Sequence, residues 1–152
     1  MPDYVSADAL PEYVGKDLEP SDWFLVDQDR INQFADATAD HQFIHTDPDR
    51  AKQTPFGATI AHGYLTLSLL PKLTRDLGIM PENMKMGLNY GLNKVRFLQP
   101  VKVDSELRAR VTLREVSEKA PGQVLLAFDV TVEIKGEEKP ALIAETLALC
   151  VL

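Results

Sequence analysis

The chain has 152 residues, of which 45% are hydrophobic and 26% are charged, so it has the composition of a globular protein and not of a disordered one. Its length fits one domain spanning residues 1–152 and leaves little room for two. A formal net charge of −7 argues against nucleic-acid binding, which relies on Lys and Arg to neutralise phosphates.

Membrane association and secretion are also disfavoured by the sequence. No apolar run reaches the roughly 20 residues that a membrane helix needs, and the first residues lack the basic-then-apolar pattern of a secretory signal. The single cysteine, Cys150, has no partner in the chain for a disulfide, which agrees with a reducing compartment. We therefore expect a cytoplasmic protein.

Charge is unevenly distributed along the chain. Residues 1–50 carry 12 acidic and 3 basic residues, whereas residues 51–152 carry 11 acidic and 13 basic ones. Any anionic ligand should therefore meet the second part. The basic candidates, each of which is equally explained as ordinary solvated surface charge, are Lys52, Lys85, Lys94, Arg96 and Lys102.

The first secondary-structure elements are expected to be short. Residues 1–20 are polar and loosely patterned, and we expect them to form an N-terminal extension packed on the main body, with one short helix near Ala7–Val14. A short strand is predicted at residues 22–26, where aromatic and aliphatic residues follow one another.

Three further helices are predicted in the first half of the chain. One begins at Asp29, a plausible N-cap, and ends near Thr38, and a second short one begins at Asp47-Pro48 because Pro is tolerated in the first helical turn. The third and longest spans Gly63–Leu77, with leucines at i+4 spacing that predict a buried central helix. Pro71 is expected to kink it.

The second half of the chain changes from a helical to an alternating hydrophobic pattern, which predicts long antiparallel strands. Turns are indicated at Ala120-Pro121-Gly122 and Lys135-Gly136-Glu137. An α+β fold follows, in which an antiparallel sheet covers the long helix. The predicted strands lie at residues 94–97, 107–114, 124–134 and 141–151.

Histidine is rare in this chain, yet two of its three histidines lie in one short loop with an aspartate. His41 and His45 share a loop with Asp40, and His62 directly precedes the Gly63 helix start. A His with a near-neutral pKa beside a carboxylate suits general acid–base chemistry. On spacing alone, capping of the neighbouring helices explains this loop equally well.

The start of the Gly63 helix is a second candidate for chemistry. Free backbone N–H groups and the positive end of the helix dipole can polarise a carbonyl oxygen there. Glycine also lets a substrate approach the backbone closely. The signal is weak by itself, because most helices begin with free N–H groups.

Two linked motifs resemble the MaoC-like (R)-specific enoyl-CoA hydratases. They read Asp40-(x)4-His45-(x)5-Ala51 and Phe56-Gly57-(x)3-Ala61-His62-Gly63-(x)4-Ser68. The resemblance continues through Asn89-Tyr90-Gly91-Leu92-Asn93-Lys94-Val95-Arg96-Phe97 and Pro100-Val101, covers roughly residues 20–152, and is strongest for the mycobacterial enoyl-CoA hydratase and nodulation-protein-N-like branch.

The resemblance implies a hot-dog fold, in which the sheet wraps around the central helix, and a homodimer whose two sheets run on as one. It implies (R)-specific hydration of enoyl thioesters carried by coenzyme A or acyl carrier protein. No cofactor and no metal are expected, since coenzyme A enters only as part of the substrate.

The resemblance also assigns roles to residues. Asp40 and His45 match the catalytic pair, Gly63 matches the backbone donor to the thioester carbonyl, and Ser68 matches a serine that hydrogen-bonds near the aspartate. Gln42-Phe43 replaces the Asn-Pro usual in the family's loop, which puts the loop's backbone support in doubt. Residues that could contact substrate, or be structural, are His62, Tyr64, Asn89, Tyr90 and Asn93.

Three alternatives remain open at this point. A metal site at His41, His45 and Asp47 lacks the Glu of the metalloprotease pattern and any cysteine cluster. A hot-dog thioesterase would use the same fold with a carboxylate that activates water. A non-catalytic acyl-binding subunit is the third, although such partners lack the Asp–His pair that is present here.

Overall fold

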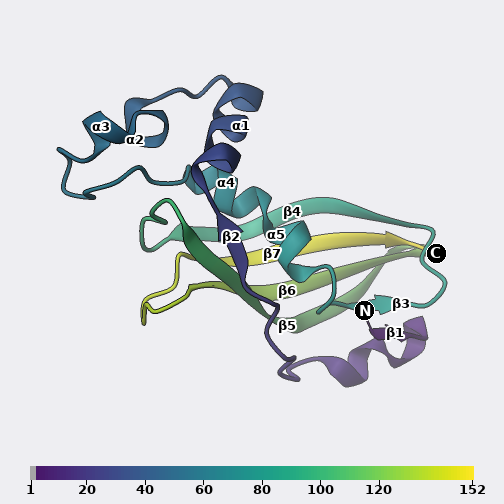
Figure 1. Cartoon of the computed structure of the whole chain (residues 1–152). Coiled ribbons are helices and arrows are strands. Elements are labelled where there is room, and N and C mark those ends of the chain that lie inside the picture. Colours follow the sequence, from purple (N-terminus) through teal and green to yellow (C-terminus); the bar gives the residue numbers. More distant parts are fainter. Residues whose placement is uncertain (1–2) are drawn as a thin grey trace.

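The computed structural model describes residues 3–152. Figure 1 shows the helices of residues 28–51 gathered beyond one end of a curved sheet, the helices of residues 63–74 lying along the sheet, and the short helix of residues 7–13 near its other end. In chain order the elements are β1 (Asp3–Val5), the 3-10 helix η1 (Ala7–Tyr13), β2 (Phe24–Val26), α1 (Gln28–Thr38), α2 (Phe43–Thr46), α3 (Pro48–Ala51), α4 (Gly63–Ser68), α5 (Leu70–Thr74), β3 (Ile79–Pro81), β4 (Met86–Phe97), β5 (Ser105–Ala120), β6 (Gln123–Ile134) and β7 (Leu142–Val151).

The main sheet has five strands in the order β2-β5-β6-β7-β4, and every neighbouring pair is antiparallel. Its long strands follow the alternation seen in the sequence, with alternate β5 side chains buried. The β5–β6 and β6–β7 connections each contain a glycine with positive φ, Gly122 at 74° and Gly136 at 84°. The α+β prediction is confirmed, and β2 and β4 are the sheet edges.

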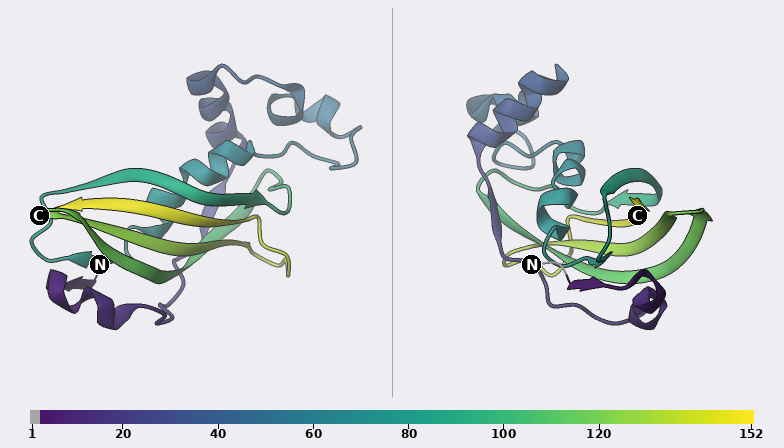
Figure 2. Two further views of the ribbon diagram at one scale, coloured as in Figure 1. Left: turned by 180° about the vertical axis from the view of Figure 1, so that it is seen from behind. Right: turned by 90° about the vertical axis from the view of Figure 1, so that its right-hand side faces the viewer.

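The hydrophobic core lies between the sheet and the pair α4–α5, around which the sheet curls (Figure 2). Leucines of α4 and α5 supply the helical side of the core, and buried residues of β5, β6 and β7 supply the other. Truncating one such leucine to alanine costs about 2–5 kcal/mol in cores of this kind. The helical leucines are Leu65, Leu69, Leu70 and Leu73.

The predicted single helix from Gly63 to Leu77 is two helices. α4 ends at Ser68, α5 begins at Leu70 and ends at Thr74, and α1, with 11 residues, is the longest helix described. Pro71 lies in the first turn of α5, where its missing N–H costs nothing. The expected kink is therefore a break, after which the chain starts a new helix.

Two aspartates cap the helices α1 and α3, and one of these caps differs from the prediction. Asp27, not Asp29, caps α1, with its Oδ1 accepting a hydrogen bond of 2.9 Å from the Arg30 N–H. Asp47 caps α3 in the same way, accepting from the Arg50 N–H at 3.1 Å. Asp29 instead lies in the first turn of α1, where its charge favours the helix dipole.

The described part of the N-terminal segment packs on the sheet. Leu10 of η1 is fully buried in the main core, and the Gly15 N–H donates a hydrogen bond of 2.9 Å to the Leu113 carbonyl of β5. β1 pairs in parallel with β3. Among residues 3–152, no helix is long and apolar enough to cross a bilayer.

Candidate active site

Asp40 follows directly on the end of α1. Ala39 ends the helix in the left-handed conformation, with φ of 58°, and the Asp40 N–H donates to the Ala35 carbonyl at 3.1 Å. A non-glycine residue in this region is uncommon and costs free energy. This turn leaves the Asp40 carboxylate exposed, and among the residues that the structure describes it makes only a long 3.4 Å contact with the Gln42 N–H.

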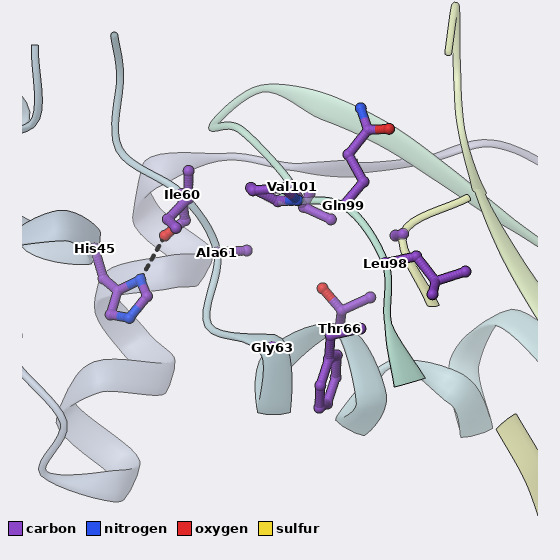
Figure 3. A pocket seen from close by; sticks show the side chains of 11 residues that line it. His45, Ile60, Ala61, Gly63, Thr66, Leu98, Gln99 and Val101 are labelled. Atoms are coloured by element: carbon purple, nitrogen blue, oxygen red, sulfur yellow. Dashed lines mark hydrogen bonds between the residues drawn. The ribbon is translucent and has the colours of Figure 1, made fainter. Parts of the chain in front are cut away.

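His45 is presented by α2 with one defined tautomer. Its side chain is buried, and its Nδ1 lies 2.7 Å from the Ile60 carbonyl oxygen (Figure 3). A carbonyl oxygen only accepts hydrogen bonds, so Nδ1 carries the proton. The Nε2 of the neutral ring therefore keeps its lone pair and is free to act as a base.

The backbone of His45 is fixed by a side-chain relay from α1. The Gln28 Nε2 donates to the His45 carbonyl at 2.7 Å, and the hydroxyl of buried Thr59 donates to the Gln28 Oε1 at 2.5 Å. The His45 carbonyl belongs to the last turn of a four-residue helix, where carbonyls lack helical partners. Gln28 thus caps α2 at the residue that carries the imidazole.

We expect Gln28→Met to lower kcat about tenfold with little change in KM. Losing the amide frees the α2 backbone, and small displacements of a reacting group are costly in rate. The measurement is steady-state turnover of an enoyl thioester, the substrate class that the sequence resemblance implies. Gln33→Met is the matched control, because Gln33 lies on the same helix and bonds only to exposed Asp29. Equal activities of the two variants would contradict this role.

His62 completes a cluster with Asp40 and His45. Its ring stacks on the His45 ring, with centroids 3.8 Å apart and planes at 22°. Its Nε2 lies 3.0 Å from the Asp40 carbonyl oxygen, so this nitrogen carries the proton. Within residues 3–152 the buried Nδ1 of His62 has no hydrogen-bond partner. His62 therefore ties the Asp40 turn to the imidazole beneath it.

One ring nitrogen of each histidine and a carboxylate oxygen of Asp40 lie within 4.8 Å of one another. The Asp40 carboxylate and His45 make no direct hydrogen bond in the described chain, and this separation suits one bridging water. The same atoms could suggest a metal ion. However, the two stacked rings direct their in-plane lone pairs side by side instead of toward one point, which is poor geometry for shared coordination.

Burial lowers the pKa of His45 below its ordinary value of 6.5, and neighbouring His62 lowers it further, while the Ile60 carbonyl and Asp40 oppose this.

Because the neutral ring is the base, kcat/KM should hold its plateau below pH 6.5 and fall only when His45 protonates at lower pH. The unfolded chain binds this proton first, so stability should also fall as pH drops below 6.5. A pH profile of kcat/KM checks this, and an acid limb centred above pH 6.5 would contradict it.

A pocket of about 240 Å³ opens beside this cluster (Figure 3). His45, Gly63 and Thr66 reach it from the helical side, and the segment that follows β4 closes the other side. A Cβ built on Gly63 would lie 3.2 Å from the Phe97 ring, so this close approach favours glycine. The remaining lining residues are Ile60, Ala61, Leu98, Gln99, Pro100, Val101 and Ala141.

Comparison with known proteins decides the family. The sequence pattern of the MaoC-like domain matches residues 10–134. The chain belongs to the MaoC-like dehydratase family. It is 45% identical over 147 residues to 3-hydroxyacyl-thioester dehydratase Z of Mycobacterium tuberculosis, with 97% of each chain covered. It is 47% identical over 143 residues to nodulation protein N of Rhizobium leguminosarum bv. viciae, covering 92% of this chain and 88% of that protein.

Solved structures confirm the hot-dog fold expected for a MaoC-like protein. The R-hydratase PhaJ1 from Pseudomonas aeruginosa aligns with a TM-score of 0.71 at 22% identity, over 91% of this chain and 81% of that one. An (R)-hydratase from A. caviae involved in PHA biosynthesis aligns with a TM-score of 0.66 at 21% identity, over 88% of this chain and 95% of that one. The sequence matches confirm the branch of the family that the resemblance indicated, with mycobacterial and nodulation-protein-N relatives.

The structure brings together some of the residues predicted from the sequence and separates others. Asp40, His45, His62 and Gly63 lie at one site. The Ser68 side chain is exposed and makes no hydrogen bond within residues 3–152, so the expected bond near Asp40 is absent from this chain. Outside the pocket lie Tyr64 on α4, and Asn89, Tyr90 and Asn93 on exposed β4.

The loop departure at Gln42-Phe43 has a local structural explanation. Phe43 takes the first position of α2, and the Arg50 guanidinium lies 4.2 Å from the centroid of its ring. His41 takes no part in the cluster, because its Nε2 pairs with Asp36 at 2.9 Å on the exposed side. The proposed ligand set of His41, His45 and Asp47 is therefore not assembled.

Sequence reasoning missed four residues of the site. Gln28 and Thr59 lie 17 and 14 positions from His45, and neither belongs to a recognisable motif. Thr66 and Phe97 line the pocket. Only Thr66 carried a usable signal, since it follows Gly63 by three positions and so shares its helix face.

Proposed function

We propose that this hydro-lyase catalyses the reversible, (R)-specific addition of water to a trans-2-enoyl thioester of coenzyme A or acyl carrier protein. The observation that carries the proposal is that a ring nitrogen of His45 and a carboxylate oxygen of Asp40 lie within 4.8 Å of each other, while His45 also lines an apolar pocket. Hydration needs proton transfer at two carbons, and this pair supplies two acid–base groups.

In the proposed reaction, the His45 Nε2 takes a proton from a water held by Asp40, and the water oxygen attacks the β-carbon. Negative charge moves to the thioester carbonyl oxygen, which accepts a hydrogen bond from the backbone N–H of Gly63 at the start of α4. The α-carbon then receives a proton from the same pair. The reverse sequence dehydrates a 3-hydroxyacyl thioester, and no cofactor takes part.

The test is incubation of the purified protein with crotonyl-CoA. Loss of the enoyl absorbance without release of free thiol, together with an (R)-3-hydroxyacyl product, supports the proposal. Thiol release would identify a thioesterase instead. Thermal stabilisation by the thioester without turnover would identify a non-catalytic acyl-binding subunit.

We also propose that two copies pair through β4. This strand is a sheet edge with an unpaired side, and it exposes alternate apolar side chains. Tyr64 and Phe97 continue this surface toward the pocket, with their rings in an edge-to-face arrangement and the ring centroids 6.1 Å apart. The exposed apolar residues of β4 are Met86, Leu88, Tyr90, Leu92 and Phe97. A homodimer in the cytoplasm, where the buried thiol of Cys150 stays reduced, fits these features.

A further inference from the structure

The Thr66 hydroxyl is a polar group at the site with no protein partner. Thr66 is 3% exposed, it lines the pocket with His45 and Gly63, and its hydroxyl makes no hydrogen bond within residues 3–152. In Figure 3 its side chain extends from α4 on the side of Ala61 and Val101. The hydroxyl oxygen is not fully enclosed by the protein, so it is open to a molecule in the pocket, which can supply the hydrogen-bond partner that a hydroxyl at such a site requires.

Other threonines near helix ends behave differently. Thr38, Thr54 and Thr74 each donate to a backbone carbonyl three or four residues earlier, at 2.7, 2.6 and 2.6 Å. This local bond is the default for a helical threonine. Among the described residues, the Thr66 hydroxyl makes no such bond to the His62 carbonyl, which accepts from the N–H groups of Leu65 and Thr66, so the hydroxyl is left to the pocket.

The position of Thr66 on α4 indicates which substrate atom it meets. Helical side chains lean toward the N-terminus, so the hydroxyl of Thr66 lies over the turn that begins at Gly63, three residues earlier. The Gly63 N–H has no intrahelical acceptor because it belongs to the first turn. The hydroxyl and this N–H therefore face the same part of the pocket.

We infer that the Thr66 hydroxyl donates a second hydrogen bond to the thioester carbonyl oxygen, beside the Gly63 N–H. This inference deepens the proposed function, on which it rests for the identity of the substrate. The bond strengthens as negative charge develops on the oxygen, so it accelerates the reaction more than it improves binding.

The experiment compares wild type, Thr66→Val, Thr66→Ser and Thr74→Val. Thr66→Val is nearly isosteric and removes only the hydroxyl, Thr66→Ser retains it, and Thr74→Val removes a threonine that is already satisfied by its own helix. Isotope-edited infrared spectra are recorded with butyryl-CoA labelled at its thioester carbonyl, which has no double bond to hydrate. Crotonyl-CoA hydration is measured in parallel.

Binding to wild type should move the labelled carbonyl stretch to lower wavenumber. Thr66→Val should lose part of this displacement and about tenfold to a hundredfold in kcat, with KM changing less, whereas Thr66→Ser and Thr74→Val should keep both. An unchanged carbonyl stretch in Thr66→Val, or failure of Thr66→Ser to restore it, would overturn the inference. The infrared result needs no turnover, so a wild type that polarises butyryl-CoA but does not hydrate crotonyl-CoA contradicts the proposed function alone.

Discussion

Asp40→Asn should lower kcat for crotonyl-CoA hydration by about a hundredfold to ten-thousandfold, the range that a positioned acid–base group contributes. Asparagine has nearly the same shape, but it is neutral and cannot exchange a proton with water at neutral pH. The Asp40 side chain is exposed and makes one long contact, so the fold should be unaffected. Steady-state kinetics and circular dichroism measure the two effects.

His45→Gln should have an effect of similar size for a different reason. A glutamine amide can still donate a hydrogen bond to the Ile60 carbonyl, which preserves the buried contact that holds the side chain. It cannot replace the basic Nε2 of the imidazole. The double variant with Asp40→Asn should lose little more than either single variant, because both residues act on the same water.

The matched control is His41→Gln in the same loop. His41 is exposed and pairs with Asp36, away from the cluster. Because such exposed pairs contribute little, the substitution should leave kcat within about twofold of wild type. Near-normal hydration by Asp40→Asn or His45→Gln would mean that the acid–base assignment is wrong, whatever the control shows.

The strands β5, β6 and β7 were predictable because a sheet with one buried face imposes an alternation that the sequence must carry, whereas β1, β3 and residues 86–93 of β4 were not predicted. Helix boundaries were less predictable, because neighbouring residues compete to cap the same helix. Asp27 and Asp29 are both suitable caps, and only the backbone decides that Asp27 accepts from Arg30. The break after Ser68 depends on how far one proline disturbs a leucine-rich segment, which hydrophobic periodicity does not report.

The residues of the site also divide into those that the sequence predicted and those that it did not. Asp40, His45, His62 and Gly63 lie in two compact motifs, so the sequence already placed them together. Contacts that hold His45 come from elsewhere in the chain. The Gln28 and Thr59 side chains meet only after α1 and the segment before α4 have packed against each other. Such relays leave no local pattern because the partners need only complementary donors and acceptors.

Ser68 shows the opposite error. Its spacing from Gly63 fitted the family motif, but five residues along a helix place its side chain on a different face from that of Gly63. Thr66, at a spacing of three, is the α4 hydroxyl that reaches the pocket. Helical geometry therefore corrects an assignment that motif spacing alone suggested.

The double substitution Leu88→Lys with Leu92→Lys should convert the proposed homodimer into a monomer. Both side chains are exposed on β4, at 44% and 45%, so each protomer should fold without them. In a dimer whose β4 strands pair, the four added charges would lie in the shared surface, where like charges and buried lysines are unfavourable. Analytical ultracentrifugation at several protein concentrations measures the mass.

Leu25→Lys is the control that makes this result specific. Leu25 is 49% exposed on β2, the opposite edge of the same sheet, so it tests whether any exposed leucine on an edge strand has the same effect. This variant should remain dimeric. β2 is only three residues long, and short edge strands offer little backbone for pairing, whereas β4 offers twelve residues. Dissociation by Leu25→Lys, with the β4 variant still dimeric, would place the interface on the other edge and leave the apolar surface of β4 without a partner.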